Sequence, residues 1–241
     1  MKQILITGAT SGIGESLAVR YARNGSEVIA CGRNAERLQH LCQEHPNLRA
    51  LPFDITEREQ VAQAADTLEA LDLVVLNAGD CEYIDDAGNF DGALFKRVIT
   101  VNLLSMGDLL EHLIPKIRNG GKLVFVSSSV TYLPLPRAEA YGASKAGVDY
   151  LAKTLAIDLA SRNIAVTLVQ PGFIKTPLTD KNDFSMPFLL SAEQAAERIV
   201  DGVEKRKKIL DFPKRFTYML RFLSWMPFSC WRWLLTRKKN T

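Results

Sequence analysis

Short apolar runs alternate with longer amphipathic segments between residues 2 and 212. The runs hold β-branched residues or leucine at consecutive positions, which is typical of parallel strands buried on both faces. The segments between them, such as residues 14–24, 34–45 and 57–68, place apolar residues at helical spacing. This alternation predicts an α/β fold with a doubly wound parallel sheet, covered by helices on both faces. The predicted strands span residues 3–7, 27–31, 48–53, 71–76, 122–127, 165–169 and 208–212.

The chain changes character after Lys205, although 241 residues with 47% apolar content fit one α/β domain. Residues 1–203 hold 19 basic and 25 acidic side chains, whereas residues 204–241 hold 11 basic and only two acidic ones. We therefore expect a single domain over residues 1–212 and a basic, aromatic extension over residues 213–241.

The four cysteines form no C-x-x-C pair, and no histidine lies at metal-ligand spacing from them. We therefore expect neither a metal site nor a disulfide framework, but reduced thiols in a cytoplasmic protein. The first apolar run, residues 4–6, is too short for the apolar region of an export signal.

Three glycines, Gly8, Gly12 and Gly14, follow the first predicted strand and precede helix-forming residues. Glycines at this point permit a tight turn and let a pyrophosphate approach backbone N–H groups at a helix N-terminus. A turn and helix cap without any ligand would use the same residues. Their place in a strand-helix-strand unit nevertheless predicts a nucleotide site.

Gly32 and Arg33 end the second predicted strand, where folds that bind NAD carry an acidic side chain for the ribose hydroxyls. A guanidinium can instead make charge-assisted bonds to a 2′-phosphate, so this pair favours NADP. A solvated arginine at the start of the next helix is the alternative interpretation.

Tyr141 and Lys145 lie four residues apart at the start of a predicted helix, on one face and about one turn apart. A nearby cation stabilises a phenolate. We therefore expect Lys145 to lower the Tyr141 pKa from its reference value of about 10 and to make the phenol a general acid or base. An ordinary surface helix can carry the same spacing by chance.

Together these motifs resemble those of the short-chain dehydrogenase/reductase family over residues 3–212. The spacing G-x-x-x-G-x-G, the Asn-Ala-Gly element, the Tyr-x-x-x-Lys pair and the later Pro-Gly segment occur in the family's order. One departure is Leu76, which stands where the family often has a second asparagine. The resemblance implies a Rossmann-like fold and NADP as cofactor. The implied cofactor-binding residues are Gly8, Thr10, Ser11, Gly12, Ile13, Gly14, Arg33, Asp54, Ile55, Asn77, Ala78, Gly79, Tyr141, Lys145, Pro171, Gly172, Ile174 and Thr176.

The resemblance also implies a catalytic set of Asn102, Ser128, Tyr141 and Lys145. The family's serine lies thirteen residues before its tyrosine, a position that is Ser128 at the end of a predicted strand. A hydroxyl there can hydrogen-bond a substrate carbonyl, and strand alternation would turn the two neighbouring serines to the opposite face. Asn102 matches the asparagine of the family's proton relay.

The implied reaction transfers a hydride between NADP(H) and a carbonyl or alcohol, with Tyr141 passing the proton and Lys145 holding the nicotinamide ribose. Residues 177–190 would cap the pocket, and their apolar end suits a hydrophobic small molecule, although it could simply close the core. The alternative function is an NADP-binding regulatory or interaction protein with little turnover. The intact reactive set argues against that alternative, because a binding module does not need these side chains.

In this family, helices that open near Asn102 and Tyr141 commonly pair across a two-fold axis, which implies a homodimer or homotetramer. Here they carry more apolar residues than one sheet contact requires, although all of these could pack inside one subunit. The residues are Leu103, Leu104, Leu109, Leu110, Val148, Leu151 and Leu155.

The extension concentrates aromatic side chains, eight of the chain's 20 in residues 212–233, and ends in a basic run at residues 237–239. Its longest charge-free run is ten residues long and contains Pro227, which is too short to span a bilayer. Two interpretations stay open: packing over the substrate pocket or a neighbouring subunit, and peripheral contact with an anionic membrane. Nucleic-acid binding is not expected, because the acidic body does not extend the basic surface.

Overall fold

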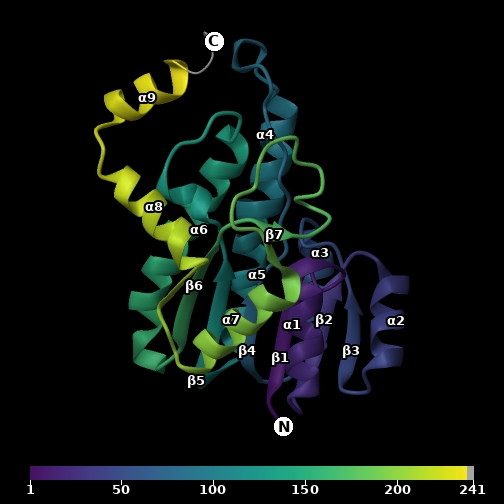
Figure 1. Cartoon of the computed structure of the whole chain (residues 1–241). Coiled ribbons are helices and arrows are strands. Elements are labelled where there is room, and N and C mark those ends of the chain that lie inside the picture. Colours follow the sequence, from purple (N-terminus) through teal and green to yellow (C-terminus); the bar gives the residue numbers. More distant parts are fainter. Residues whose placement is uncertain (238–241) are drawn as a thin grey trace.

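Seven parallel strands form the central sheet of the computed structural model, which describes residues 1–237 (Figure 1). The strand order is β3-β2-β1-β4-β5-β6-β9, so the winding direction reverses between β1 and β4. The predicted doubly wound α/β fold is confirmed. A separate small sheet pairs β7 (Ile174–Lys175) with β8 (Leu190–Ser191). The strands of the main sheet are β1 (Gln3–Thr7), β2 (Glu27–Gly32), β3 (Leu48–Pro52), β4 (Leu71–Leu76), β5 (Ile117–Val126), β6 (Ala165–Pro171) and β9 (Ile209–Phe212).

Helices pack on both faces of this sheet, and successive strand residues face opposite cores. Ile4 and Ile6 of β1 face the core built on α1, α2 and α7, whereas Leu5 faces the core built on α3, α5 and α6. All three side chains are fully buried, which explains why β1 is apolar at consecutive positions. The helices are α1 (Gly12–Arg23), α2 (Ala35–Glu44), α3 (Arg58–Asp66), α4 (Gly92–Ile99), α5 (Ser105–Leu113), α6 (Glu139–Asp158), α7 (Ala192–Glu204), α8 (Lys214–Ser224) and α9 (Phe228–Arg237).

The predicted strand limits differ most from the observed ones at β5, which begins at Ile117 rather than at residue 122. Leu71 of β4 pairs with Ile117, and after a register shift Leu73 pairs with Lys122. The residues between carry polar side chains or are glycines, including Gly120 with a φ of 82°. The apolar pattern therefore indicates only the regular part of this strand.

The extension folds as two helices, α8 and α9, which are joined by a short connection over residues 225–227 that contains Pro227 (Figure 1). Phe216 and Leu220 of α8 and Trp231 of α9 form a buried apolar cluster with Leu133, and the Trp231 indole N–H donates to the Pro134 carbonyl at 2.8 Å. The inner faces of both helices therefore pack on the body of the protein. No helix within residues 1–237 is long and apolar enough to cross a bilayer. Lys238 and Lys239 of the predicted basic run lie outside the described residues.

The seven apolar residues that were predicted to form a subunit contact differ in their burial. Leu109, Leu110 and Val148 are buried in the core beneath α5 and α6, because they lie on the helix faces turned toward the sheet. They are therefore unavailable to a second subunit. Leu104 is exposed, and Leu103, Leu151 and Leu155 are partly buried.

Candidate active site

The carboxyl ends of β1, β4, β5 and β6 open onto a cavity of about 400 Å³, next to the point where the strand order reverses. The cavity brings together residues from the segments that follow six strands, β1 to β6, which are far apart in the sequence. Of the predicted site residues, only Gly14 and Asn102 do not line it. Those that do are Gly8, Thr10, Ser11, Gly12, Ile13, Arg33, Asp54, Ile55, Asn77, Ala78, Gly79, Ser128, Tyr141, Lys145, Pro171, Gly172, Ile174 and Thr176.

The loop between β1 and α1 requires its glycines. Gly8 and Gly12 have φ values of 68° and 57°, in the left-handed region that side chains disfavour. A Cβ at Gly14 would lie 2.2 Å from the Gly8 carbonyl oxygen, so this glycine permits close packing behind the loop rather than contact with a ligand. The Asn77 amide donates to the Thr7 and Gly8 carbonyls at 3.1 and 3.3 Å and ties β4 to this loop. The first turn of α1 thus presents its backbone N–H groups to the cavity.

At the β2 end of the cavity, the Arg33 side chain is 78% exposed. Its nearest carboxylate is Asp54, with Nη1 and Oδ2 separated by 3.9 Å, so the guanidinium makes only a loose ion pair. Asp54 is oriented by Thr56, whose backbone N–H and hydroxyl donate to its Oδ1 at 2.9 and 2.8 Å. A Cβ at Gly32 would lie 2.8 Å from Thr10 Cγ2, so a glycine best fits this position. A phosphate bound here would lie near the Arg33 cation, and no acidic side chain at position 32 would repel it.

Tyr141 and Lys145 both reach the cavity from the first turns of α6. The Lys145 Nζ lies 5.9 Å from the centroid of the Tyr141 ring and donates to the Val126 carbonyl at 3.0 Å. Lys145 is only 4% exposed, and burial lowers its pKa to about 8.

The Tyr141 pKa differs from the sequence prediction. Burial raises the pKa of Tyr141 above its usual value, Cys81 adds to the rise, and the Ser128 hydroxyl opposes it. The expected lowering of this pKa by Lys145 is therefore wrong for this arrangement, because desolvation of the phenolate has the largest effect and the Ser128 hydroxyl, not Lys145, opposes it. Tyr141 is held in its protonated form at neutral pH.

Asn102 lies behind the cavity wall in a π-helical turn, Thr100–Leu104, between α4 and α5. Its side chain accepts from the Asp80 N–H at 2.7 Å, and it donates to the Asp80 carbonyl at 2.8 Å and to the Ser144 hydroxyl at 2.9 Å. A Cβ at Gly79 would lie 3.0 Å from the Asn102 Oδ1 and 3.3 Å from the Lys145 Nζ. Asn102 therefore joins the loop after β4 to the helix that carries Tyr141 and Lys145.

The three serines after β5 have different surroundings. The Ser127 hydroxyl donates to Asp149 at 2.5 Å, and Ser129 is buried in a 3₁₀ turn, Ser129–Tyr132. Ser127 and Ser128 both line the cavity, and the Ser128 oxygen accepts from the Val130 N–H at 3.2 Å. Strand alternation does not extend over all three serines, because β5 ends at Val126.

A second cavity, of about 310 Å³, adjoins the first. The two cavities share Ser128, Tyr141, Gly172, Leu178 and Thr179, and Ser128 and Tyr141 are the two of these that were predicted as catalytic. Along its wall, the Phe173 ring contacts the rings of Phe184 and Phe216, with centroids 6.0 and 5.4 Å apart. Phe184 is partly exposed at the cavity edge, so this part of residues 177–190 forms a lid rather than core.

The sequence prediction named the capping segment and the extension, but not the residues of these segments that line the cavities. Thr179 and Lys181, in the lid, line the first cavity, and Phe216 and Leu220, on α8, line the second. The helical spacing of Phe216 and Leu220 was the available signal for α8. No pattern identified the lid residues, because their position depends on the turn that follows β7.

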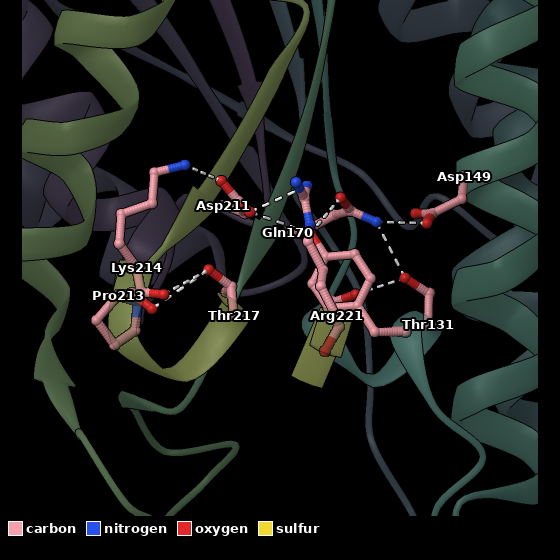
Figure 2. Close-up of polar contacts among 10 residues, drawn as sticks. Thr131, Asp149, Gln170, Asp211, Pro213, Lys214, Thr217 and Arg221 are labelled. Atoms are coloured by element: carbon pink, nitrogen blue, oxygen red, sulfur yellow. Dashed lines mark hydrogen bonds and ion pairs between the residues drawn. The ribbon is translucent and has the colours of Figure 1, made fainter. Parts of the chain in front are cut away.

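A chain of polar side chains fixes α8 to α6, the helix that carries Tyr141 and Lys145 (Figure 2). The Gln170 amide donates to Asp149 of α6 at 2.6 Å, and the Tyr132 hydroxyl donates to the Gln170 oxygen at 2.8 Å. Arg221 of α8 donates to the Tyr132 oxygen at 3.1 Å and pairs with Asp211 of β9 at 3.0 Å. The connection thus runs from α6 through β6 to the extension.

Asp211 carries the charge at the centre of this connection and is 4% exposed. Burial alone would raise the pKa of its carboxyl, but Lys214 and Arg221 hold that pKa below its usual value. Both cations belong to α8, so the helix supplies the counter-charge of a buried carboxylate.

A family model described as short chain dehydrogenase matches residues 2–186. An uncharacterized oxidoreductase from Myxococcus xanthus is 32% identical over 233 residues, covering 92% of each chain. The 3-oxoacyl-[acyl-carrier-protein] reductase FabG from Thermotoga maritima is 38% identical over 196 residues, covering 75% of this chain and 77% of that protein. A solved structure described as the closed form of serine dehydrogenase complexed with NADP+ superimposes with a TM-score of 0.76, at 26% identity and with 87% and 94% coverage. The chain therefore belongs to the short-chain dehydrogenase family and is an oxidoreductase.

Proposed function

We propose that this protein is an NADP(H)-dependent oxidoreductase that interconverts a carbonyl and an alcohol on an apolar small molecule. The observation that carries the proposal is that the two cavities meet at Ser128 and Tyr141. One cavity has the glycine loop and a cation suited to a dinucleotide, and the other has an aromatic wall suited to an apolar substrate. The two reactants would then meet beside a hydroxyl and a phenol.

The residues around the first cavity fit a dinucleotide. Side chains are excluded at Gly8 and Gly12, and the N-terminus of α1 favours anionic phosphates. Lys145 would hold the nicotinamide ribose, and Arg33 would hold a 2′-phosphate. The bound cofactor supplies or accepts the hydride. The NADP+ complex of the serine dehydrogenase that superimposes on this chain supports the choice of NADP.

Tyr141 would exchange the proton with the substrate oxygen, while the Ser128 hydroxyl would hydrogen-bond that oxygen. The raised pKa of Tyr141 keeps the phenol protonated at neutral pH, which favours the role of acid in carbonyl reduction. Asn102 would position the helix that carries Tyr141 and Lys145 through its contacts to Asp80 and Ser144.

A panel of apolar ketones and aldehydes, assayed by NADPH oxidation, tests this function. The unmodified protein should turn over at least one of them, and Tyr141→Phe should lower kcat by about 100-fold or more. NADPH binding to the variant, followed by fluorescence, should be unchanged because the ring still packs against the apolar cluster that contains Ile84, Leu94 and Val98. Near-normal turnover in Tyr141→Phe would contradict the role of the phenol, and the absence of turnover by the unmodified protein would favour the regulatory alternative.

A further inference from the structure

The outward sides of α8 and α9 expose a row of large apolar side chains, here called the outer face. On α8, Phe222 is 74% exposed, and Trp225, which directly follows the helix, is 87% exposed. Single exposed apolar residues are ordinary on protein surfaces, but a cluster of this kind marks an interaction site. The exposed apolar residues of the outer face are Tyr218, Met219, Phe222, Trp225, Phe228, Trp233 and Leu234.

The outer face has a fixed orientation. Arg221 and Lys214 pair with the buried Asp211, and Trp231 is buried with its N–H bonded to the Pro134 carbonyl. Phe216 and Leu220 occupy the inner side of α8, where they line the second cavity. Because these contacts hold the inner side, the residues at the opposite side of each helix must face outward.

The charges around the outer face have one sign. Residues 213–241 contain seven lysines or arginines and no acidic residue. Within the described part of the chain, Arg215, Arg232 and Arg237 form no ion pair, and Arg237 lies over the Trp233 ring at 4.6 Å. The outer face therefore presents cations beside aromatic rings, with no acid of its own to neutralise them.

From these observations we infer that the outer face docks on the surface of an anionic lipid bilayer. Tryptophan and phenylalanine enter the interfacial region of a bilayer, and arginine binds anionic headgroups. A second copy of the chain is a poorer partner, because a two-fold contact would bring two basic extensions together. Docking would be peripheral, since neither helix is long enough to span.

Docking also suggests where the substrate resides, a step that rests on the proposed function. The inner side of α8 lines the apolar cavity while its outer side would lie on lipid. The substrate class would then be apolar carbonyls or alcohols dissolved in the membrane rather than in water.

Sedimentation with vesicles tests the docking without any assay of activity. The full chain should sediment with vesicles of phosphatidylcholine and phosphatidylserine at low salt, remain in the supernatant with phosphatidylcholine alone, and dissociate as salt is added. Trp225→Ser combined with Phe222→Ser should weaken binding by about 10-fold or more, since both rings lose their lipid contact. Arg232→Gln should weaken it about fivefold.

Phe90→Ser is the matched control, because Phe90 is an exposed aromatic residue outside the extension. It should bind vesicles like the unmodified protein. Failure of the full chain to sediment with anionic vesicles at low salt would overturn the docking. Unchanged vesicle binding by the double variant would also overturn the docking. If the double variant instead changes from an oligomer to a smaller species, the outer face is a contact between copies of the chain, and the docking is overturned as well.

The substrate class is tested separately. Vesicles should increase turnover of a lipid-dissolved ketone and leave that of a water-soluble ketone unchanged. Equal effects on both would reject the membrane-dissolved substrate while leaving the docking and the oxidoreductase function intact.

Discussion

Two cations of the site, Arg33 and Lys145, differ in their exposure to water. Arg33 is largely exposed at the cavity edge, so its charged form stays solvated when no ligand is bound. Lys145 is buried, so its charged form lacks solvation and its pKa falls to about 8. Replacing Arg33 should therefore affect ligand binding, whereas replacing Lys145 should affect the stability of the fold.

Replacing Arg33 should change cofactor choice. The unmodified protein should bind NADPH more tightly than NADH, by about 1 to 3 kcal/mol for one charge-assisted contact, and Arg33→Ala should narrow that difference. Dissociation constants for both nucleotides, from fluorescence titration, provide the check. Arg37→Ala is the control, because Arg37 pairs with Glu15 outside the cavity. Equal affinity of the unmodified protein for both nucleotides would refute the role of Arg33.

Replacing Lys145 should change how stability depends on pH. Its pKa is about 8 in the folded protein and 10.5 ordinarily, so between these values the unfolded chain binds more protons and stability rises with pH. The charged form costs the fold about 3 kcal/mol below pH 8, and this cost disappears as the pH approaches the ordinary pKa. Lys145→Met lacks this dependence.

Urea unfolding of both proteins between about pH 7 and pH 10 measures the difference. The advantage of Lys145→Met should be largest at the lower pH and should shrink as the pH rises. Unfolding free energies that stay parallel across the range would show that the Lys145 pKa is not lowered.

The positions of the reactive residues could be predicted, but their environments could not. Motif spacing placed Tyr141, Lys145 and Ser128 together because the ends of parallel strands meet at one edge of the sheet. The Tyr141 pKa was predicted in the wrong direction, since burial depends on residues distant in the sequence. The contacts of Asn102 to Asp80 and Ser144 likewise depend on how two loops meet.

Helix α8 connects α6, which carries Tyr141 and Lys145, to the wall of the apolar cavity. Arg221→Ala would leave Asp211 with Lys214 alone and would remove the donor to Tyr132. We expect a loss of about 1 to 3 kcal/mol in unfolding free energy and a higher KM for an apolar substrate. NADPH affinity should be unchanged, because α8 contributes nothing to the first cavity. Arg215→Ala on the outward side of α8 is the control and should alter none of these quantities in the absence of lipid.

An increase in the dissociation constant for NADPH equal to the increase in KM would contradict this division between the two cavities. Unchanged KM and stability would show that the polar connection does not hold α8 in place.

The spacing of apolar residues along the chain predicted most helices and strands, but it did not show which role α8 has. Strands and helices over residues 1–212 follow their patterns because each packs on a sheet with a buried face. For the extension, composition left packing and membrane contact as alternatives. A helix has two sides, so Phe216 can be buried while Phe222 is exposed, and one segment can serve both roles.

At the scale of the whole molecule, the assembly remains a prediction. Leu104, Tyr150 and Ile157 are exposed on the π-helical turn and α6, and they support a homodimer or homotetramer. Light scattering at micromolar concentration should give at least twice the mass of one chain, and Ile157→Glu should lower it, because a charge would be buried in the contact. A monomeric unmodified protein would contradict this prediction.

The residues of the glycine loop are synthesised before those that complete the apolar cavity. Chains emerge from the N-terminus at about 5–20 residues per second, and β1, β2 and β3 with the glycine loop come first. β9 and α8, which complete the sheet edge and wall the apolar cavity, come last. A chain that terminates early or is cleaved before α8 keeps the glycine loop, but it leaves Asp211 without its cations and the apolar cavity without one wall. Translation therefore finishes the glycine loop well before the pocket that it serves.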